Sequence, residues 1–151
     1  MENPILDHNL GTVPSGKLYK DRSLWVATFF GGPLAAGYIL AENFKSLGKT
    51  STSRNTWIYT ILITILLFVA VFNIPDNIPF PNQIIPIISI LVANWILTNS
   101  QGKQINRHVE AGGEVYSTWR GLLIGVICLL ITLTVVIGVF FVADLMITSE
   151  P

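Results

Sequence analysis

The stretch WRGLLIGVICLLITLTVVIGVFFV, residues 119–142, decides what kind of protein this is. After Arg120 it carries no charged side chain, and it stays apolar until Asp144 follows its end. A helix needs a run of about 20 apolar residues to cross the hydrocarbon core of a bilayer. The stretch therefore predicts a transmembrane helix.

Three more apolar segments precede it, at about 24–41, 57–73 and 81–98. The chain of 151 residues is 51% hydrophobic and only 12% charged, whereas about 25% charged residues is usual in soluble domains. The predicted fold class is all-α, a small helical transmembrane bundle of four hydrophobic segments. Residues 1–22 are expected to form a flexible N-terminal arm, residues 23–146 a single transmembrane domain and residues 147–151 a tail.

The first of these segments is interrupted at its centre by Gly31-Gly32-Pro33. Glycine relaxes the backbone, and proline removes a hydrogen-bond donor and clashes with the preceding turn of a helix. One outcome is a kinked helix that crosses the membrane. The other is a re-entrant pair of half-helices that returns to the side on which it began.

The distribution of charge bears on this choice. All nine Lys and Arg residues lie in Lys17–Arg22, Lys45–Arg54 and Lys103–Arg120. Cytoplasmic loops carry the excess of such residues, so the latter two stretches are expected inside, with the turn around Asp76 and the tail outside. If the first segment crosses, the basic residues of the arm lie outside, against the rule. Segment length favours a crossing, while charge and the Gly-Gly-Pro break favour re-entry, and both readings stay open.

Small residues mark the positions where helices are expected to approach closely, because they let backbones come together. Asn94 is the one strongly polar side chain well inside an apolar segment. An amide in lipid needs a partner, so Asn94 is expected to face the bundle, either in a helix–helix hydrogen bond or in a polar path. The predicted helix-packing residues are Gly31, Gly32, Pro33, Ala36, Gly121 and Gly125.

Signatures of catalysis, cofactor binding or metal binding are missing from the sequence. His108 and Glu110 are two residues apart and point to different faces of a helix, and no second His or Cys stands at ligand spacing. Cys128 is the only cysteine. Residues 99–118 are expected to contain a short amphipathic surface helix broken at Gly112-Gly113. We expect no catalytic residues, no cofactor, no metal and no nucleic-acid partner.

Three stretches of the chain resemble a group of small bacterial multi-pass membrane proteins known only as hypothetical proteins. They are NPILDHNLGTVPSGKLYKDR, WVATFFGGPLAAGYILAENFKSLGK and HVEAGGEVYSTWRG. The resemblance implies a bacterial inner-membrane setting and no mechanism. The leading hypothesis is a non-enzymatic membrane protein that acts through helix association, with itself or with another membrane protein. The alternative is a subunit of a small-solute or ion pore or transporter.

Overall fold

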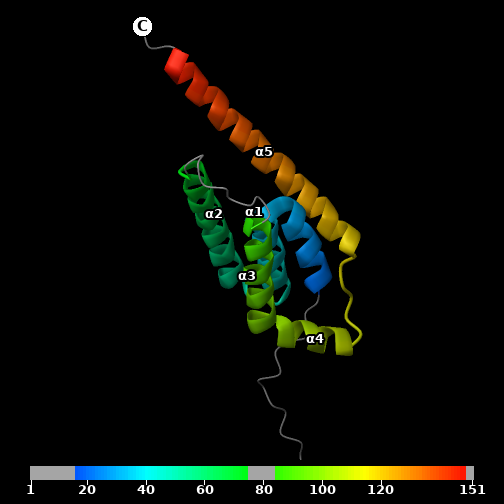
Figure 1. The fold of residues 1–151 in the computed structure, drawn as a ribbon. Helices are drawn as coiled ribbons and strands as arrows, with labels where there is room; N and C mark the ends of the chain where they lie inside the picture. Colours follow the sequence, from blue (N-terminus) through cyan, green and yellow to red (C-terminus); the bar gives the residue numbers. More distant parts are fainter. Residues whose placement is uncertain (1–15, 75–83, 149–151) are drawn as a thin grey trace, which may run out of the picture.

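The computed structural model describes residues 16–74 and 84–148. The expected arm before Gly16, the turn around Asp76 and the tail after Thr148 lie outside these residues. The described chain forms five helices: α1 Asp21–Ser46, α2 Thr50–Phe72, α3 Ile84–Ser100, α4 Gly102–Glu110 and α5 Thr118–Thr148 (Figure 1). The predicted all-α class is confirmed. α2 begins earlier than the apolar segment at 57–73, and α5 continues past Asp144. Polar residues at the end of an apolar segment can continue the helix, so the change in polarity does not mark the helix end.

Several helices are fit to cross a membrane. By length and composition α1, α2 and α5 qualify, and α3 together with α4 forms a fourth candidate bent by 64° between its two parts. The predicted segments thus form helices long and apolar enough to cross a membrane, although the third qualifies only together with α4. α4 lies within the stretch where a short surface helix is predicted, and it ends at Glu110, before Gly112-Gly113.

α1 is not a straight rod, because it folds back on itself at Gly32. Gly32 has a φ of +60° and a ψ of −152°, a combination that essentially only glycine adopts. Pro33 follows as the first residue of the second half, a position where its missing N–H is not needed. Figure 1 shows the two halves running side by side in opposite directions. Gly32, predicted as a packing residue, has nothing within 4 Å of where a Cβ would stand, so its contribution is the turn itself.

The hydrogen bonds at the ends of α1 agree with this geometry. The Asn43 side chain accepts a hydrogen bond from the Tyr19 N–H at 2.7 Å and donates one to the Tyr19 carbonyl at 2.9 Å. In a continuous helix residues this far apart would be separated by about 36 Å. Length and composition alone would let α1 cross, but its two ends lie together at one end of the bundle.

This helical hairpin is the centre of the molecule. α2, α3 and α5 each pack against α1, while α4 packs against α3. Within the described residues α2, α3 and α5 do not pack along one another. α2 and α5 nonetheless meet through an edge-to-face contact of the Phe72 and Phe140 rings, with centroids 5.5 Å apart.

Glycines let α5 lie directly on the first half of α1. A Cβ added to Gly121 would stand 2.6 Å from the Ser23 carbonyl oxygen, and one added to Gly125 would stand 2.9 Å from that of Ala27. One added to Gly31 would stand 2.8 Å from the Cβ of Cys128. Real Cβ atoms do not approach other atoms so closely, so the helix spacing at this contact depends on the glycines. The predicted packing residue Ala36 is buried in the core on the second half of α1.

All three basic stretches meet at one end of the bundle, which we call the basic end (described residues 16–22, 45–54 and 101–120). Figure 1 places here both ends of α1, the start of α2, the end of α3, all of α4 and the start of α5. A hydrogen bond of 3.2 Å from the Lys49 ammonium to the Gln104 side-chain oxygen joins two of the stretches.

Candidate functional site at the basic end

The most highly organised polar structure lies at the basic end, where residues 16–20 are held between α1 and the connection before α5. The Leu18 N–H donates to the Glu114 carbonyl at 3.3 Å, and the Tyr116 N–H donates to the Leu18 carbonyl at 2.9 Å. Leu18 and Tyr19 are fully buried. Because Asn43 binds the other edge of the same short segment, the segment behaves like a strand between two partners.

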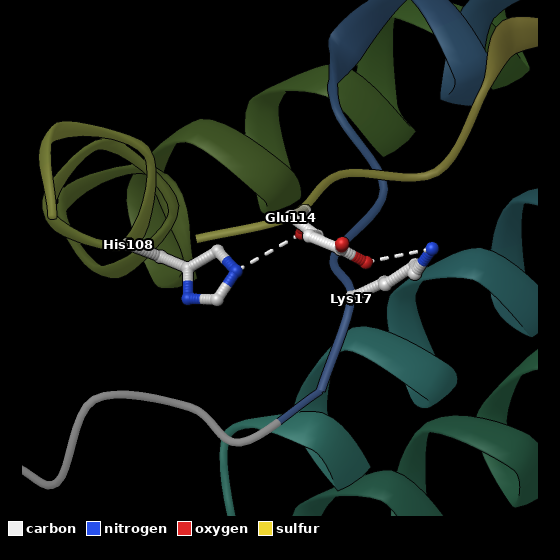
Figure 2. A network of polar contacts seen from close by, with 3 residues as sticks. All are labelled: Lys17, His108 and Glu114. Carbon is white, nitrogen blue, oxygen red and sulfur yellow. Dashed lines mark hydrogen bonds and ion pairs between the residues drawn. The ribbon is translucent and has the colours of Figure 1, made fainter. Parts of the chain in front are cut away.

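Glu114 connects this segment to α4, as Figure 2 shows. Its carboxylate forms an ion pair of 2.7 Å with the Lys17 ammonium, and its backbone carbonyl lies 3.0 Å from Nε2 of His108. The hydrogen bond and charge of Lys17 hold the pKa of the Glu114 carboxyl below its usual range. Both ion-pair side chains are largely exposed, and exposed pairs contribute about 0–1 kcal/mol to stability. The pair therefore orients the connection more than it stabilises it.

His108 is buried beneath this connection. A carbonyl can only accept, so Nε2 carries the proton of this hydrogen bond, and Nδ1 has no hydrogen-bond partner among the described residues. The imidazole packs so closely on Gly113 that any Cβ there would overlap it. Thus His108 is engaged as a packing residue. Among the described residues no three His, Cys, Asp or Glu side chains gather in a way that could hold a metal ion.

A second buried amide, Gln101, fixes the corner between α3 and α4. Its side-chain N–H donates to the Leu40 carbonyl at 3.0 Å, and the residue is only 1% exposed. The contact ties the bend to the second half of α1. The sequence singled out neither Gln101 nor the link between Asn43 and Tyr19, because a polar residue next to an apolar segment usually marks the water boundary. Nothing local in the sequence distinguishes a buried amide from an exposed one.

An aromatic and cationic stack closes the basic end beside α5. The rings of Tyr19 and Tyr116 are 4.3 Å apart at their centroids, and the Arg120 guanidinium carbon lies 4.2 Å from the centre of the Tyr116 ring. Burial raises the pKa of Tyr19 to about 12, although the nearby charge of Arg120 opposes the rise. The Tyr19 hydroxyl is buried and has no hydrogen-bond partner in the part of the chain that the structure describes, so Arg120 acts on it through its charge.

Asn94, the predicted intramembrane polar residue, lies on α3 and meets α1. Its side-chain oxygen accepts a hydrogen bond of 3.0 Å from the Trp25 indole N–H. Of the two expectations for Asn94, the structure contains the helix–helix hydrogen bond.

Two hollows of different character accompany these features. A polar groove of about 660 Å³ lies where α1 and α5 begin, between them and α4. An apolar hollow of about 280 Å³ lies beyond the Gly32 turn, between the middle of α2, the start of α3 and α5. Comparisons of the chain with protein-family models, with curated proteins and with solved structures find no match.

Proposed function

We propose that this chain is an integral protein of the bacterial inner membrane in which α2, α3 and α5 cross and α1 re-enters. The support is the position of the basic residues. Because α1 folds back, residues 17–22 lie at the same end as the other two basic stretches. With this end on the cytoplasmic side, every Lys and Arg would lie inside, which agrees with the excess of such residues in cytoplasmic loops.

Single cysteines introduced in place of Lys17, Ser51 and Ser149, each in a Cys128→Ser background, test this topology. With an impermeant thiol reagent on intact cells, positions 17 and 51 should be protected and position 149 labelled. After the membrane is permeabilised all three should react. Labelling of position 17 but not of position 51 on intact cells would mean that α1 crosses, and the re-entrant arrangement would be wrong.

Within that membrane we propose that the protein works by helix association, as a self-assembling unit or as an accessory subunit of a larger membrane protein. The observation that carries this proposal is the outer half of α5, which projects beyond the hairpin (Figure 1). Gly138 lies there with no atom of the described residues within 4 Å of where a Cβ would stand, in a shallow hollow lined by Val135, Val139, Val142 and Ala143 among others. Small residues at a helix surface let a second helix approach closely.

Gly138→Ile tests the proposed association, because it fills the hollow while keeping α5 apolar. We expect the wild-type protein, extracted in a mild detergent, to elute as an oligomer or with a membrane partner. The variant should lose that association and should retain its insertion and thermal stability. Leu123→Phe, at an exposed position near the other end of α5, is the control and should still associate. If Gly138→Ile associates like wild type, the outer half of α5 is not the interface.

A second candidate function, a subunit of a pore or transporter, is favoured by the broken helix. Discontinuous helices near the bilayer midplane form the substrate sites of many transporters. The surroundings of the Gly32 turn argue against it, since the hollow there is mainly apolar and the Thr64 hydroxyl in it already donates to the Thr60 carbonyl at 2.7 Å. Only a polar path assembled from several subunits would support this function. A measurement of solute flux into vesicles that contain the purified protein distinguishes a pore or transporter from a protein that acts by association.

A further inference from the structure

The polar groove at the basic end has the composition of an anion site. It lies where the first turns of α1 and α5 meet, and its volume of about 660 Å³ falls within the roughly 300–1,000 Å³ of ligand pockets. Its polar lining comes from both helix starts and from α4. These polar residues are Lys20, Asp21, Arg22, Ser23, Asn106, Ser117 and Thr118.

Two basic side chains of the groove form no ion pair with any residue that the structure describes. In the described part of the chain the ion pairs are those of Lys17 with Glu114 and of Lys45 with Glu42. Lys20 and Arg22 take part in neither. Asp21 also lines the groove, so its carboxylate opposes an incoming anion, and the local balance is one net positive charge.

Hydrogen-bond donors without partners face the same space. Ser23 lines the groove and is only 1% exposed. Helix starts leave their first N–H groups unsatisfied and carry partial positive charge. The start of α5 is only partly capped, by a long hydrogen bond of 3.3 Å from the Trp119 N–H to the Ser117 hydroxyl. Two helix starts and two basic side chains that form no ion pair with a described residue thus meet at one groove.

We infer that this groove binds the phosphate of an anionic phospholipid headgroup on the cytoplasmic surface. The hydrogen-bond donors and basic side chains of the groove favour a phosphate group as the ligand. The lipid source follows from position, because Trp119, at 73% exposure, stands beside the groove where aromatic residues mark the membrane interface. Basic pockets beside transmembrane helices on this side of a membrane bind acidic headgroups. The inference is independent of the proposed association through α5.

Titration of the detergent-purified protein with short-chain phosphatidylglycerol and phosphatidylcholine, followed by native mass spectrometry, tests the inference. Phosphatidylglycerol should bind more tightly than phosphatidylcholine. In Lys20→Gln/Arg22→Gln its affinity should fall by roughly 30-fold, about fivefold for each basic side chain near the headgroup. Asp21→Asn should raise the affinity, a gain that misfolding cannot produce.

Lys103→Gln/Arg107→Gln is the matched control, since it removes the same charge from α4 outside the groove. Its affinity for phosphatidylglycerol should remain that of wild type. An equal loss in this control would overturn the inference, because the attraction would then belong to overall charge. Competition with inorganic phosphate distinguishes a lipid headgroup from a soluble phosphate compound as the ligand. If it displaces the lipid at comparable concentration, the ligand is a soluble phosphate compound and the assignment to lipid is wrong.

Discussion

Replacing Asn43 with Ala is expected to lower the free energy of unfolding by about 2–6 kcal/mol. The side chain is fully buried and satisfies both the N–H and the carbonyl of Tyr19. Alanine would leave two buried backbone groups without partners, and each such group costs about 1–3 kcal/mol. The loss should appear as a lower midpoint of thermal or denaturant unfolding in detergent micelles.

Two other asparagines calibrate that measurement. Asn94→Ala removes one hydrogen bond between helices, from the Trp25 indole, and such bonds average about 0.6 kcal/mol within membranes. Asn73→Ala removes an exposed bond to Val69 within its own helix end and should change stability by less than about 0.5 kcal/mol. The predicted order of destabilisation is Asn43, then Asn94, then Asn73. A midpoint for Asn43→Ala equal to that for Asn73→Ala would show that the two ends of α1 are held together by something else.

Substituting Ile for both Gly121 and Gly125 should separate α5 from the hairpin. Each added Cβ would lie within 3 Å of an α1 carbonyl oxygen, and overpacking of this kind costs about 1–3 kcal/mol per site. Backbone atoms cannot move aside as a flexible side chain can, so the helix itself must shift. Insertion into the membrane should persist, because the segment becomes more apolar.

Cys128 provides the direct readout. It is 7% exposed and lies against Gly31 at the same helix contact, so displacement of α5 should expose it to a membrane-permeant thiol reagent. We expect slow labelling in wild type and in Gly138→Ile, and fast labelling in the double variant. Unchanged labelling in the double variant would mean that the contact accommodates the added side chains. The pair of experiments also separates folding from association, since Gly138→Ile should affect only the latter.

The sequence predicts the class of this protein well, because hydrophobic length and the placement of Lys and Arg are properties of individual segments. The long apolar helices and the short helix at α4 follow from those properties. The fold-back of α1 does not follow, because Gly31-Gly32-Pro33 fits a kink as well as a turn. The structure shows the turn in the backbone of Gly32 and in the pairing of Asn43 with Tyr19, 24 residues away, which no local pattern contains.

The packing glycines illustrate the same limit. Small residues at 121 and 125 predict close approach of some helix, but apolar periodicity cannot name the partner when lipid and protein are equally apolar. The partner in the structure is the chain's own α1. The surface proposed for association is therefore the one around Gly138, further along α5. The buried groups Gln101 and His108 were not predicted as part of the core, since their burial depends on the positions of α1 and the connection before α5.

The central position of α1 also imposes an order on biosynthesis. The hairpin leaves the ribosome before the helices that cover it, and of the described helices α5 is made last. At about 5–20 residues per second, on the order of ten seconds pass between completion of Ser46 and completion of α5. During that interval the link between Asn43 and Tyr19 can already close, because both residues have been translated, whereas the Gly31 surface still faces lipid or the insertion machinery. Docking of α5 on α1 is therefore the last of the packing steps between the described helices.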